Sequence, residues 1–291
     1  MLQMQAGKER RMWTLSEKII ALDAGHGMGT LGKRCLKSID PLQTREWWLN
    51  DRIADMVEAE LATYFCRVVR AGDTTGARDV PLSSRVKTAN TAKANIYISI
   101  HHNAGISGGT GGGVNVYYYA SGKADRKAKA QRLYTAVVGK NHLTGNRSQK
   151  VVPSSGLYVL KHTSMPALLL ENGFMDSQVD TPIILTREHA EKTAQGITAF
   201  LVDELQLARR VDKPVEDVTD KAVHLGTYYR AYTGKPTTLS AALTSLGINS
   251  SYTFRRQIAA VNDIKGYMGT ANQNTQMYNL LKAGLLKRVK T

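Results

Sequence analysis

Short apolar runs alternate with helical patterns of hydrophobic residues from about residue 18 to residue 207. Residues 19–23, 96–101 and 167–170 form apolar runs whose length is typical of strands in the interior of a sheet. Residues 46–64 and 187–205 place their hydrophobic side chains at helical spacing. This alternation of strands and helices predicts an α/β fold, with a mostly parallel sheet flanked by helices.

The pattern changes near residue 208. Residues 208–222 are charged, contain Pro214 and lack apolar periodicity, which predicts a linker. We therefore expect four parts in the chain. They are a polar, flexible extension at residues 1–16, an α/β domain at residues 17–207, the linker at residues 208–222, and a second domain at residues 223–291.

Three short helical patterns predict that the second domain is small and mainly helical. They cover residues 239–246, 254–261 and 275–281. Gly247 and Gly284 follow the first and the third pattern, at the position where a left-handed residue commonly ends a helix.

The charge of the chain favours polyanionic partners. Lys and Arg number 39 against 24 Asp and Glu, which gives a formal net charge of +15, and residues 209–291 alone carry 13 against 5. Such a field attracts nucleic acid, anionic membrane surfaces or anionic wall polymers. The sequence has no helix-turn-helix, zinc-finger or RNP signature, so we expect no nucleic-acid partner. No apolar run approaches the roughly 18 residues that span a bilayer.

Two further observations bear on the compartment. The N-terminal residues are basic but lack the apolar core of a secretory signal peptide. Cys35 and Cys66, the two cysteines, cannot form a disulfide framework and lack the spacing of a zinc ribbon. We expect them to be reduced thiols.

Polar side chains of the kind that bind metals follow three of the predicted strands. His26 lies between two glycines after the first strand, His101 and His102 end the second, and Glu171 follows the third. In open α/β sheets, functional sites collect at the carboxyl ends of the strands. A carboxylate at the end of an apolar run is costly to bury unless it is paired, protonated or bound to metal.

A fourth residue, Glu46, opens the predicted helix at residues 46–64. Two histidines and one glutamate leave an open position on a tetrahedral zinc ion, and a free carboxylate beside them can move protons. His101 and His102 are adjacent in an extended segment and point to opposite faces, so we exclude His102 as a ligand. From spacing alone, two interpretations stay open. The chain is a zinc hydrolase, or the histidines are ordinary loop or core residues and Glu46 only stabilises the helix N-terminus.

Four segments carry a resemblance to a known family. ALDAGHG, TREWWLND, ISIHHNA and MPALLLENGFMDS occur in this order between residues 18 and 207, about two thirds of the chain. Together they resemble the zinc-dependent N-acetylmuramoyl-L-alanine amidases, which cut the amide bond between N-acetylmuramic acid and L-alanine in peptidoglycan. The resemblance implies one zinc ion per chain, held by His26, Glu46 and His101, with Glu171 as the catalytic general base and acid.

Weaker candidates surround this set. The resemblance suggests that Asn103 contacts substrate, with a polar strand end as the alternative. Arg70 and Arg85 are candidates for binding a peptide or muramyl carboxylate. For Arg85 a solvated charge on a helix face is the alternative. The glycine-rich residues 108–113 lack the Lys-Ser/Thr ending of a phosphate loop.

We therefore expect a lytic endolysin of phage or prophage origin. It would be made in the bacterial cytoplasm, reach the wall through a holin, and be retained there by residues 223–291. Two stretches, at residues 269–274 and 280–286, look like wall-anchoring modules of some phage lysins. A small helical appendage that only stabilises or dimerises the enzyme is the alternative for this domain. A bacterial autolysin for mother-cell lysis is the alternative context. Another zinc hydrolase of peptidoglycan, either a peptidase or a deacetylase, and a non-catalytic basic binding protein are the alternative classes.

Overall fold

A six-stranded sheet forms the centre of the larger domain. The structure is a computed structural model that describes residues 17–121, 125–210, 228–235 and 238–289. The strand order is β2-β1-β3-β6-β4-β5, and all neighbouring strands are parallel except β4 and β6. The strands are β1 (Lys18–Ala24), β2 (Cys66–Arg70), β3 (Ile96–Asn103), β4 (Val114–Tyr119), β5 (Val151–Ser154) and β6 (Ala167–Phe174).

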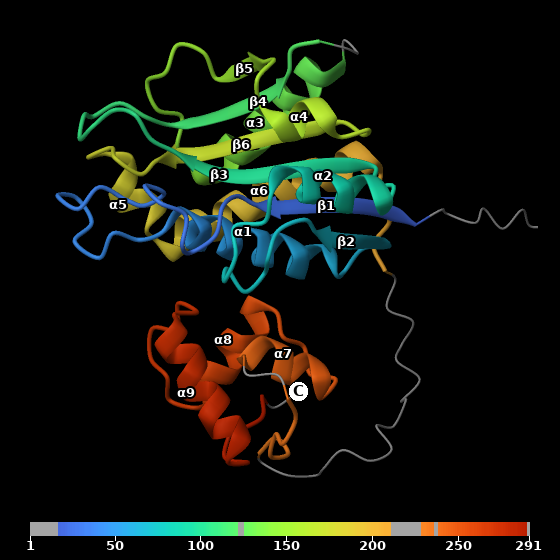
Figure 1. Ribbon diagram of the computed structural model, residues 1–291, viewed down its shortest axis with the longest axis vertical. Coiled ribbons are helices and arrows are strands. Elements are labelled where there is room, and N and C mark those ends of the chain that lie inside the picture. The colour runs from blue at the N-terminus through green and yellow to red at the C-terminus, as the bar shows by residue number, and fades with distance from the viewer. Residues whose placement is uncertain (1–16, 122–124, 211–227, 236–237, 290–291) are drawn as a thin grey trace, which may run out of the picture.

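Helices cover both faces of this sheet (Figure 1). One face carries α1 (Glu46–Leu61), α3 (Asp125–Asn141) and α6 (Arg187–Leu205), and the other carries α2 (Leu82–Thr91) and α4 (Tyr158–His162). The short α5 (Asp180–Ile184) precedes α6. The predicted fold class, an α/β domain with a mostly parallel sheet, is thereby confirmed.

The two covered faces explain why the central strands are continuous apolar runs. In β3, Ile96, Ile98 and Ile100 belong to the core on the side of α1, whereas Tyr97 belongs to the core on the side of α2. Because successive side chains point to opposite faces, a strand that is buried on both sides must be apolar throughout.

Sequence patterns do not reveal the strand β5 or the short helices α4 and α5. The strand β5 contains Pro153, which lacks a backbone N–H and is tolerated because β5 is an edge strand. The helices α4 and α5 have five residues each, too few for a helical period to be recognised in the sequence.

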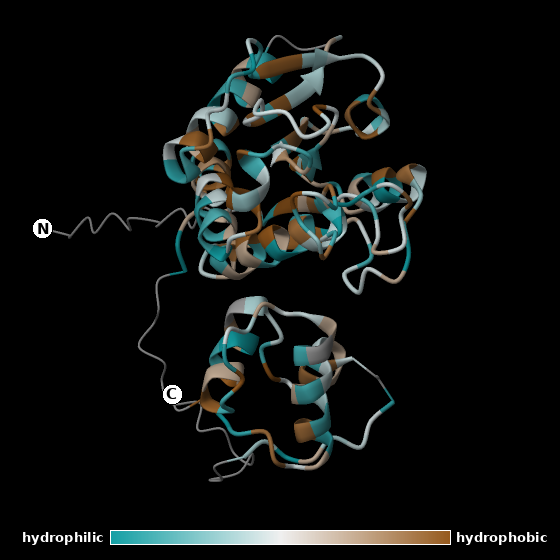
Figure 2. Cartoon of the chain, turned by 90° about the vertical axis from the view of Figure 1, so that its left-hand side faces the viewer, coloured by the Kyte–Doolittle hydropathy of each residue, from teal (hydrophilic) through white to brown (hydrophobic). Residues whose placement is uncertain are grey.

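The C-terminal unit, described at residues 228–235 and 238–289, is built from three helices. They are α7 (Leu239–Ser245), α8 (Tyr252–Val261) and α9 (Ala271–Lys282). Hydroxyl side chains cap their N-termini, and Gly247 and Gly284 have φ of +71° and +70° just after α7 and α9, as the sequence predicts. In the view of Figure 2 this unit lies below the α/β domain, and hydrophobic segments lie inside each of them.

Part of the predicted linker belongs to the α/β domain. The backbone of residues 208–210 pairs with residues 63–65 beside β2, through the bonds Phe65 N–H to Ala208 O and Arg210 N–H to Thr63 O. The linker therefore begins later than residue 208. The predicted extension at residues 1–16 and linker residues 211–222 lie outside the described residues.

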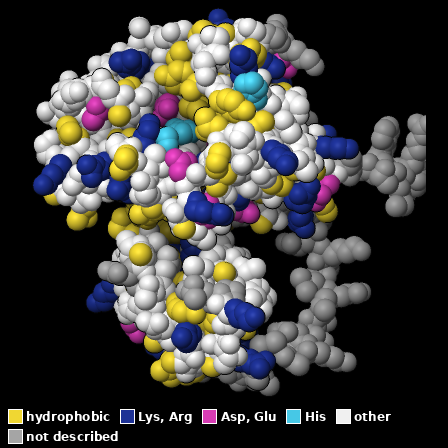
Figure 3. Space-filling model, viewed as in Figure 1, with side chains coloured by type: hydrophobic (Ala, Val, Ile, Leu, Met, Phe, Trp, Pro, Cys, Tyr) yellow, Lys and Arg dark blue, Asp and Glu magenta, His cyan; other side chains and the backbone are white. Residues whose placement is uncertain are grey.

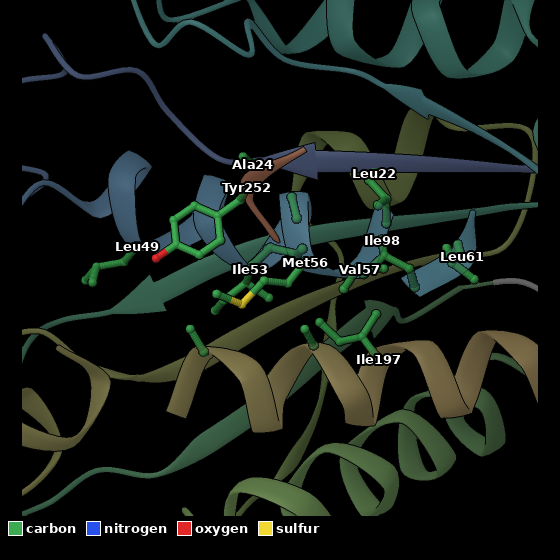
Figure 4. Packing of buried hydrophobic residues seen from close by; sticks show 14 of the residues in the cluster. Leu22, Ala24, Leu49, Ile53, Met56, Val57, Leu61, Ile98, Ile197 and Tyr252 are labelled. Carbon is green, nitrogen blue, oxygen red and sulfur yellow. The ribbon is translucent and has the colours of Figure 1, made fainter. Parts of the chain in front are cut away.

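The C-terminal unit docks on the outer face of α1. Arg255 of α8 pairs with Asp55 of α1 at 3.4 Å, and Arg256 pairs with Glu191 of α6 at 3.6 Å. Tyr252 is 4% exposed and joins the buried cluster that contains Leu49 and other α1 residues (Figure 4). A groove of about 1080 Å³ remains between α1 and the starts of α7 and α8. Among the described helices, none combines the length and apolarity needed to cross a membrane.

Candidate metal centre and active site

Neighbouring parallel strands bring His26 and His101 together. Gly25, at the end of β1, donates its N–H to the Ile100 carbonyl of β3 at 3.0 Å. The His26 and His101 rings lie 4.9 Å apart, edge to face. Gly25 is required for this approach, because a Cβ at that position would lie 2.0 Å from the His101 ring.

Glu46 lies between the two imidazoles. It is the first residue of α1 and is 1% exposed. Its Oε2 is 3.4 Å from His26 Nε2, and its Oε1 is 3.0 Å from His101 Nδ1. Burial acts to raise the pKa of Glu46, but hydrogen bonding and charge interaction with His101 and His26 hold that pKa well below its ordinary value. Glu46 is therefore a carboxylate at neutral pH.

These three residues fit a zinc ion. One ligand atom from each of His26, Glu46 and His101 lies within 4.8 Å of the others. Two imidazoles and one carboxylate are a ligand set that zinc accepts while it keeps an open position. Glu46 Oε2 is buried and makes no hydrogen bond with any described residue, so a lone pair is available to a cation. Figure 3 shows histidine and acidic side chains gathered in one hollow of the α/β domain.

Glu171 lies on the other side of this hollow. Its strand, β6, pairs in parallel with β3 and places Glu171 in register with His101. Burial raises the pKa of Glu171 to about 8; the charge of Glu46 adds to this shift and His101 opposes it. The hollow measures about 270 Å³, and Glu46, His101 and Glu171 all line it. A carboxyl group with a pKa near neutrality, beside a metal site, suits proton transfer.

His102 lies on the opposite side of β3 from His101, as strand alternation predicts. Its ring is 2% exposed, and its Nδ1 lies 2.8 Å from Asn50 Oδ1 of α1. Burial holds the pKa of His102 well below its ordinary value, so the ring is neutral. His102 thus packs between β3 and α1 and is not part of the three-residue cluster.

The three weaker candidates, Asn103, Arg70 and Arg85, lie in different surroundings. Asn103 lines the hollow at the end of β3. Arg70 lies away from it, where its guanidinium pairs with Asp51, Asp55 and Glu58 on α1. Arg85 is 1% exposed.

The surroundings of Arg85 differ from both interpretations of the sequence, a carboxylate-binding residue and a solvated charge. It is not a solvated charge on a helix face, because its side chain is buried and pairs with the buried Asp23. It also does not line the hollow that holds Glu171.

Lys33 is a residue of this hollow that the sequence analysis did not single out. Its ammonium lies 3.8 Å from Glu46 Oε2, and its carbonyl accepts the N–H of Glu46 at 3.0 Å. The isolated bridge between Arg34 and Arg45 holds the same loop against the start of α1. The only available signal was the long connection between β1 and α1, because long loops in compact domains are often functional.

Comparison with known proteins now identifies the family. Residues 20–203 match the family described as N-acetylmuramoyl-L-alanine amidase, and this stretch contains the three clustered candidate ligands and Glu171. The chain belongs to this amidase family. Its larger domain is thus the catalytic domain of a peptidoglycan amidase.

Curated relatives agree with this assignment. An endolysin of Bacillus phage SPP1 is 28% identical over 197 residues, which cover 66% of this chain and 68% of the relative. A probable cell wall amidase, LytH, of Staphylococcus saprophyticus is 29% identical over 206 residues, which cover 69% of this chain and 62% of the relative. The chain thus spans about two thirds of the length of these relatives.

Solved structures show the same catalytic fold. The catalytic domain of CwlV, an N-acetylmuramoyl-L-alanine amidase from Bacillus (Paenibacillus) polymyxa var. colistinus, is 26% identical, with a TM-score of 0.58. The similarity covers 66% of this chain and 99% of that chain. The amidase AmiC2 of Nostoc punctiforme is also 26% identical, with a TM-score of 0.55, and is covered over 98% of its length.

Proposed function

We propose that the chain is a zinc-dependent N-acetylmuramoyl-L-alanine amidase that acts as a lytic endolysin. The observation that carries the proposal is the convergence of His26, Glu46 and His101, with ligand atoms within 4.8 Å of one another, beside Glu171. His26, Glu46 and His101 would hold the zinc ion. When bound, zinc supplies Lewis acidity and lowers the pKa of a coordinated water towards neutrality.

Glu171 is the proton carrier in this proposal. Its carboxylate takes a proton from the attacking water and passes it to the nitrogen of L-alanine. The carbon–nitrogen bond then breaks, which leaves a carboxylate on the lactyl group of N-acetylmuramic acid and a free amine on L-alanine. Asn103, which lines the hollow, would contact the substrate.

We propose that residues 223–291 retain the enzyme at the wall, where peptidoglycan and anionic wall polymers are its partners. This proposal is supported by the excess of 13 Lys and Arg over 5 Asp and Glu after residue 208. The endolysin context, with holin-dependent release from the cytoplasm, is favoured by the phage relative. An autolysin is the second candidate, because the staphylococcal relative carries the name of a cell wall amidase.

Product analysis of digested peptidoglycan tests the reaction. Purified wall is incubated with the zinc-loaded chain, and newly exposed groups are identified chemically. We expect new L-alanine amino termini without new reducing sugar ends. Amino termini from another stem residue would reassign the chain as a peptidase, and free acetate alone would reassign it as a deacetylase. Binding to the wall without any product would favour a non-catalytic binding protein.

A further inference from the structure

His26 adopts an unfavourable backbone conformation. Its φ is +67°, in the left-handed region that side chains with a Cβ rarely occupy. A residue held in this region stores backbone strain and persists only where the surrounding contacts determine its conformation. The turn that presents the candidate ligand therefore needs support from its surroundings.

Arg85 supports this turn through hydrogen bonds to its backbone. One terminal nitrogen donates to the Ala24 carbonyl at 2.8 Å, and the other donates to the His26 carbonyl at 2.8 Å. The guanidinium itself is fixed by Asp23, which is 1% exposed and also accepts hydrogen bonds from Tyr97 and Ser99. Arg85 thus ties the backbone on both sides of Gly25 to a buried carboxylate.

Asp79 and Thr30 support the same turn from its outer side. Asp79 Oδ1 accepts a hydrogen bond from Arg85 at 3.1 Å, and Asp79 Oδ2 accepts one from the Thr30 hydroxyl at 2.8 Å. The Thr30 hydroxyl oxygen accepts the N–H of Gly27 at 3.0 Å. Asp79 Oδ2 also lies 4.0 Å from Nδ1 of His26, whose other ring nitrogen faces Glu46.

Arg85 has no donor left for a substrate. A guanidinium carries five N–H groups. Its Nε donates to the Val80 carbonyl at 2.8 Å, and its terminal nitrogens donate to Asp23, the Ala24 carbonyl, the His26 carbonyl and Asp79. All five donors therefore have an acceptor within the chain, which opposes a direct role in binding a peptide or muramyl carboxylate.

We propose that Arg85, Asp79 and Thr30 form a cradle that positions His26 for metal binding. The inference rests on the proposed zinc site and assigns these three residues a positioning role, without contact to substrate. Groups that hold a metal ligand in place typically contribute about 10- to 100-fold to metal affinity. Without the cradle, His26 would spend part of its time in ordinary backbone conformations that direct its ring away from Glu46.

Zinc affinity of the full chain tests the cradle. The dissociation constant is measured by competition with a chromophoric chelator for the unaltered chain, Asp79→Ala, Asp79→Asn, Thr30→Val and Arg85→Lys. We expect Asp79→Ala and Arg85→Lys to weaken zinc binding by about 10- to 100-fold. Asp79→Asn keeps one acceptor oxygen and should weaken it less, and Thr30→Val should do so by a few fold.

Matched controls separate positioning from general loss of structure. Asp125→Ala removes a half-exposed carboxylate from the start of α3, and Thr88→Val removes a surface hydroxyl from α2. The melting temperature of each metal-free variant is measured beside its control. Because Asp79 is 43% exposed, Asp79→Ala should melt close to Asp125→Ala while it loses zinc affinity.

A cobalt-loaded sample provides a second readout. The visible absorption of Co²⁺ reports the geometry of its ligands, and we expect Asp79→Ala to change that spectrum whereas Asp125→Ala leaves it unaltered. Unchanged zinc affinity in both Asp79→Ala and Arg85→Lys would overturn the cradle. Failure of the unaltered chain to bind zinc at all would instead overturn the metal site on which the inference rests.

Discussion

The two regions of this chain differ in how their residues are brought together. In the α/β domain, His26, Glu46, His101 and Glu171 come from four separate segments and meet through pairing of distant strands and packing of α1. In the C-terminal unit, each helix is defined by its own cap and its own terminating residues. Among the described residues, the one cluster of candidate metal ligands lies in the first region.

Composition follows the same division. Within the described residues of the C-terminal unit, Asp263 is the one acidic side chain, and neither histidine nor cysteine occurs. A unit without such groups offers no ligand set for a catalytic metal, but its excess of lysine and arginine suits attraction to an anionic surface. The comparison predicts that catalysis and wall retention can be altered separately.

The largest expected effect is loss of catalysis at the site. Glu171→Ala should lower the rate of peptidoglycan hydrolysis by roughly 10²- to 10⁴-fold, because the proton carrier is removed. The same variant should keep its zinc and its binding to the wall. His101→Ala should lose both zinc and activity. Metal content by atomic absorption and release of L-alanine amino termini check both variants; equal wall lysis by Glu171→Ala would contradict the assigned role.

Substitutions in the two cores compare the stability of the two regions. Ile98→Ala, in the middle of the sheet, and Leu281→Ala, in α9, both remove fully buried side chains. Each should cost about 2–5 kcal/mol, with the larger cost at whichever site collapses less around the cavity. Denaturant unfolding measures the costs. Hydrolysis of a soluble muramyl peptide by folded Leu281→Ala should stay normal, and a loss there would show that the two regions depend on each other.

Removal of positive charge from the C-terminal unit should have a smaller effect, and only on binding to the wall. Replacing the exposed Lys235 and Lys265 with Gln should weaken sedimentation with purified wall by roughly threefold to tenfold at low salt, and less at high salt. Replacing the exposed Lys87 and Lys127 of the catalytic domain is the matched control. If the control pair weakens binding equally, retention depends on total charge and not on the C-terminal unit.

The smallest effect is expected at the contact between the regions. Arg256 and Glu191 are both largely exposed, at 48% and 41% of their side chains, so solvent screens their ion pair. Arg256→Ala should change the free energy of unfolding by less than about 1 kcal/mol. Thermal unfolding with Arg132→Ala, another half-exposed arginine, as the control checks this. A loss well above the control would mean that docking is tighter than this pair indicates.

The sequence predicts the central strands and three of the candidate site residues, His26, His101 and Glu171, for one physical reason. A strand covered on both faces must be apolar, so the polar residues that end β1, β3 and β6 stand out, and parallel pairing brings those ends to one edge. What lies at the sheet edges was less predictable. The strand β5 is short and contains Pro153, and β4 runs antiparallel to β6, a reversal that apolar patterning does not encode.

The burial of Arg85 is another feature that the sequence pattern does not predict. Helical periodicity places it on α2, but its burial depends on Asp23, which is 62 residues away in the chain. Such a pair is non-local, and no local pattern distinguishes a buried arginine from a solvated one. Lys33 was missed for a related reason, since its place beside Glu46 depends on how a long loop folds back.

The docking of α8 on α1 has a consequence for building chimaeric amidases. The same helix supplies Glu46 at its first residue and Asp55 about 14 Å further along, where Arg255 attaches. An exchanged C-terminal module would therefore meet a surface whose Asp55 pairs with Arg255 of the original module. Grafts that retain the outer face of α1 together with α8 should transplant as a unit, whereas grafts joined only through residues 211–227 would leave that face without its partner.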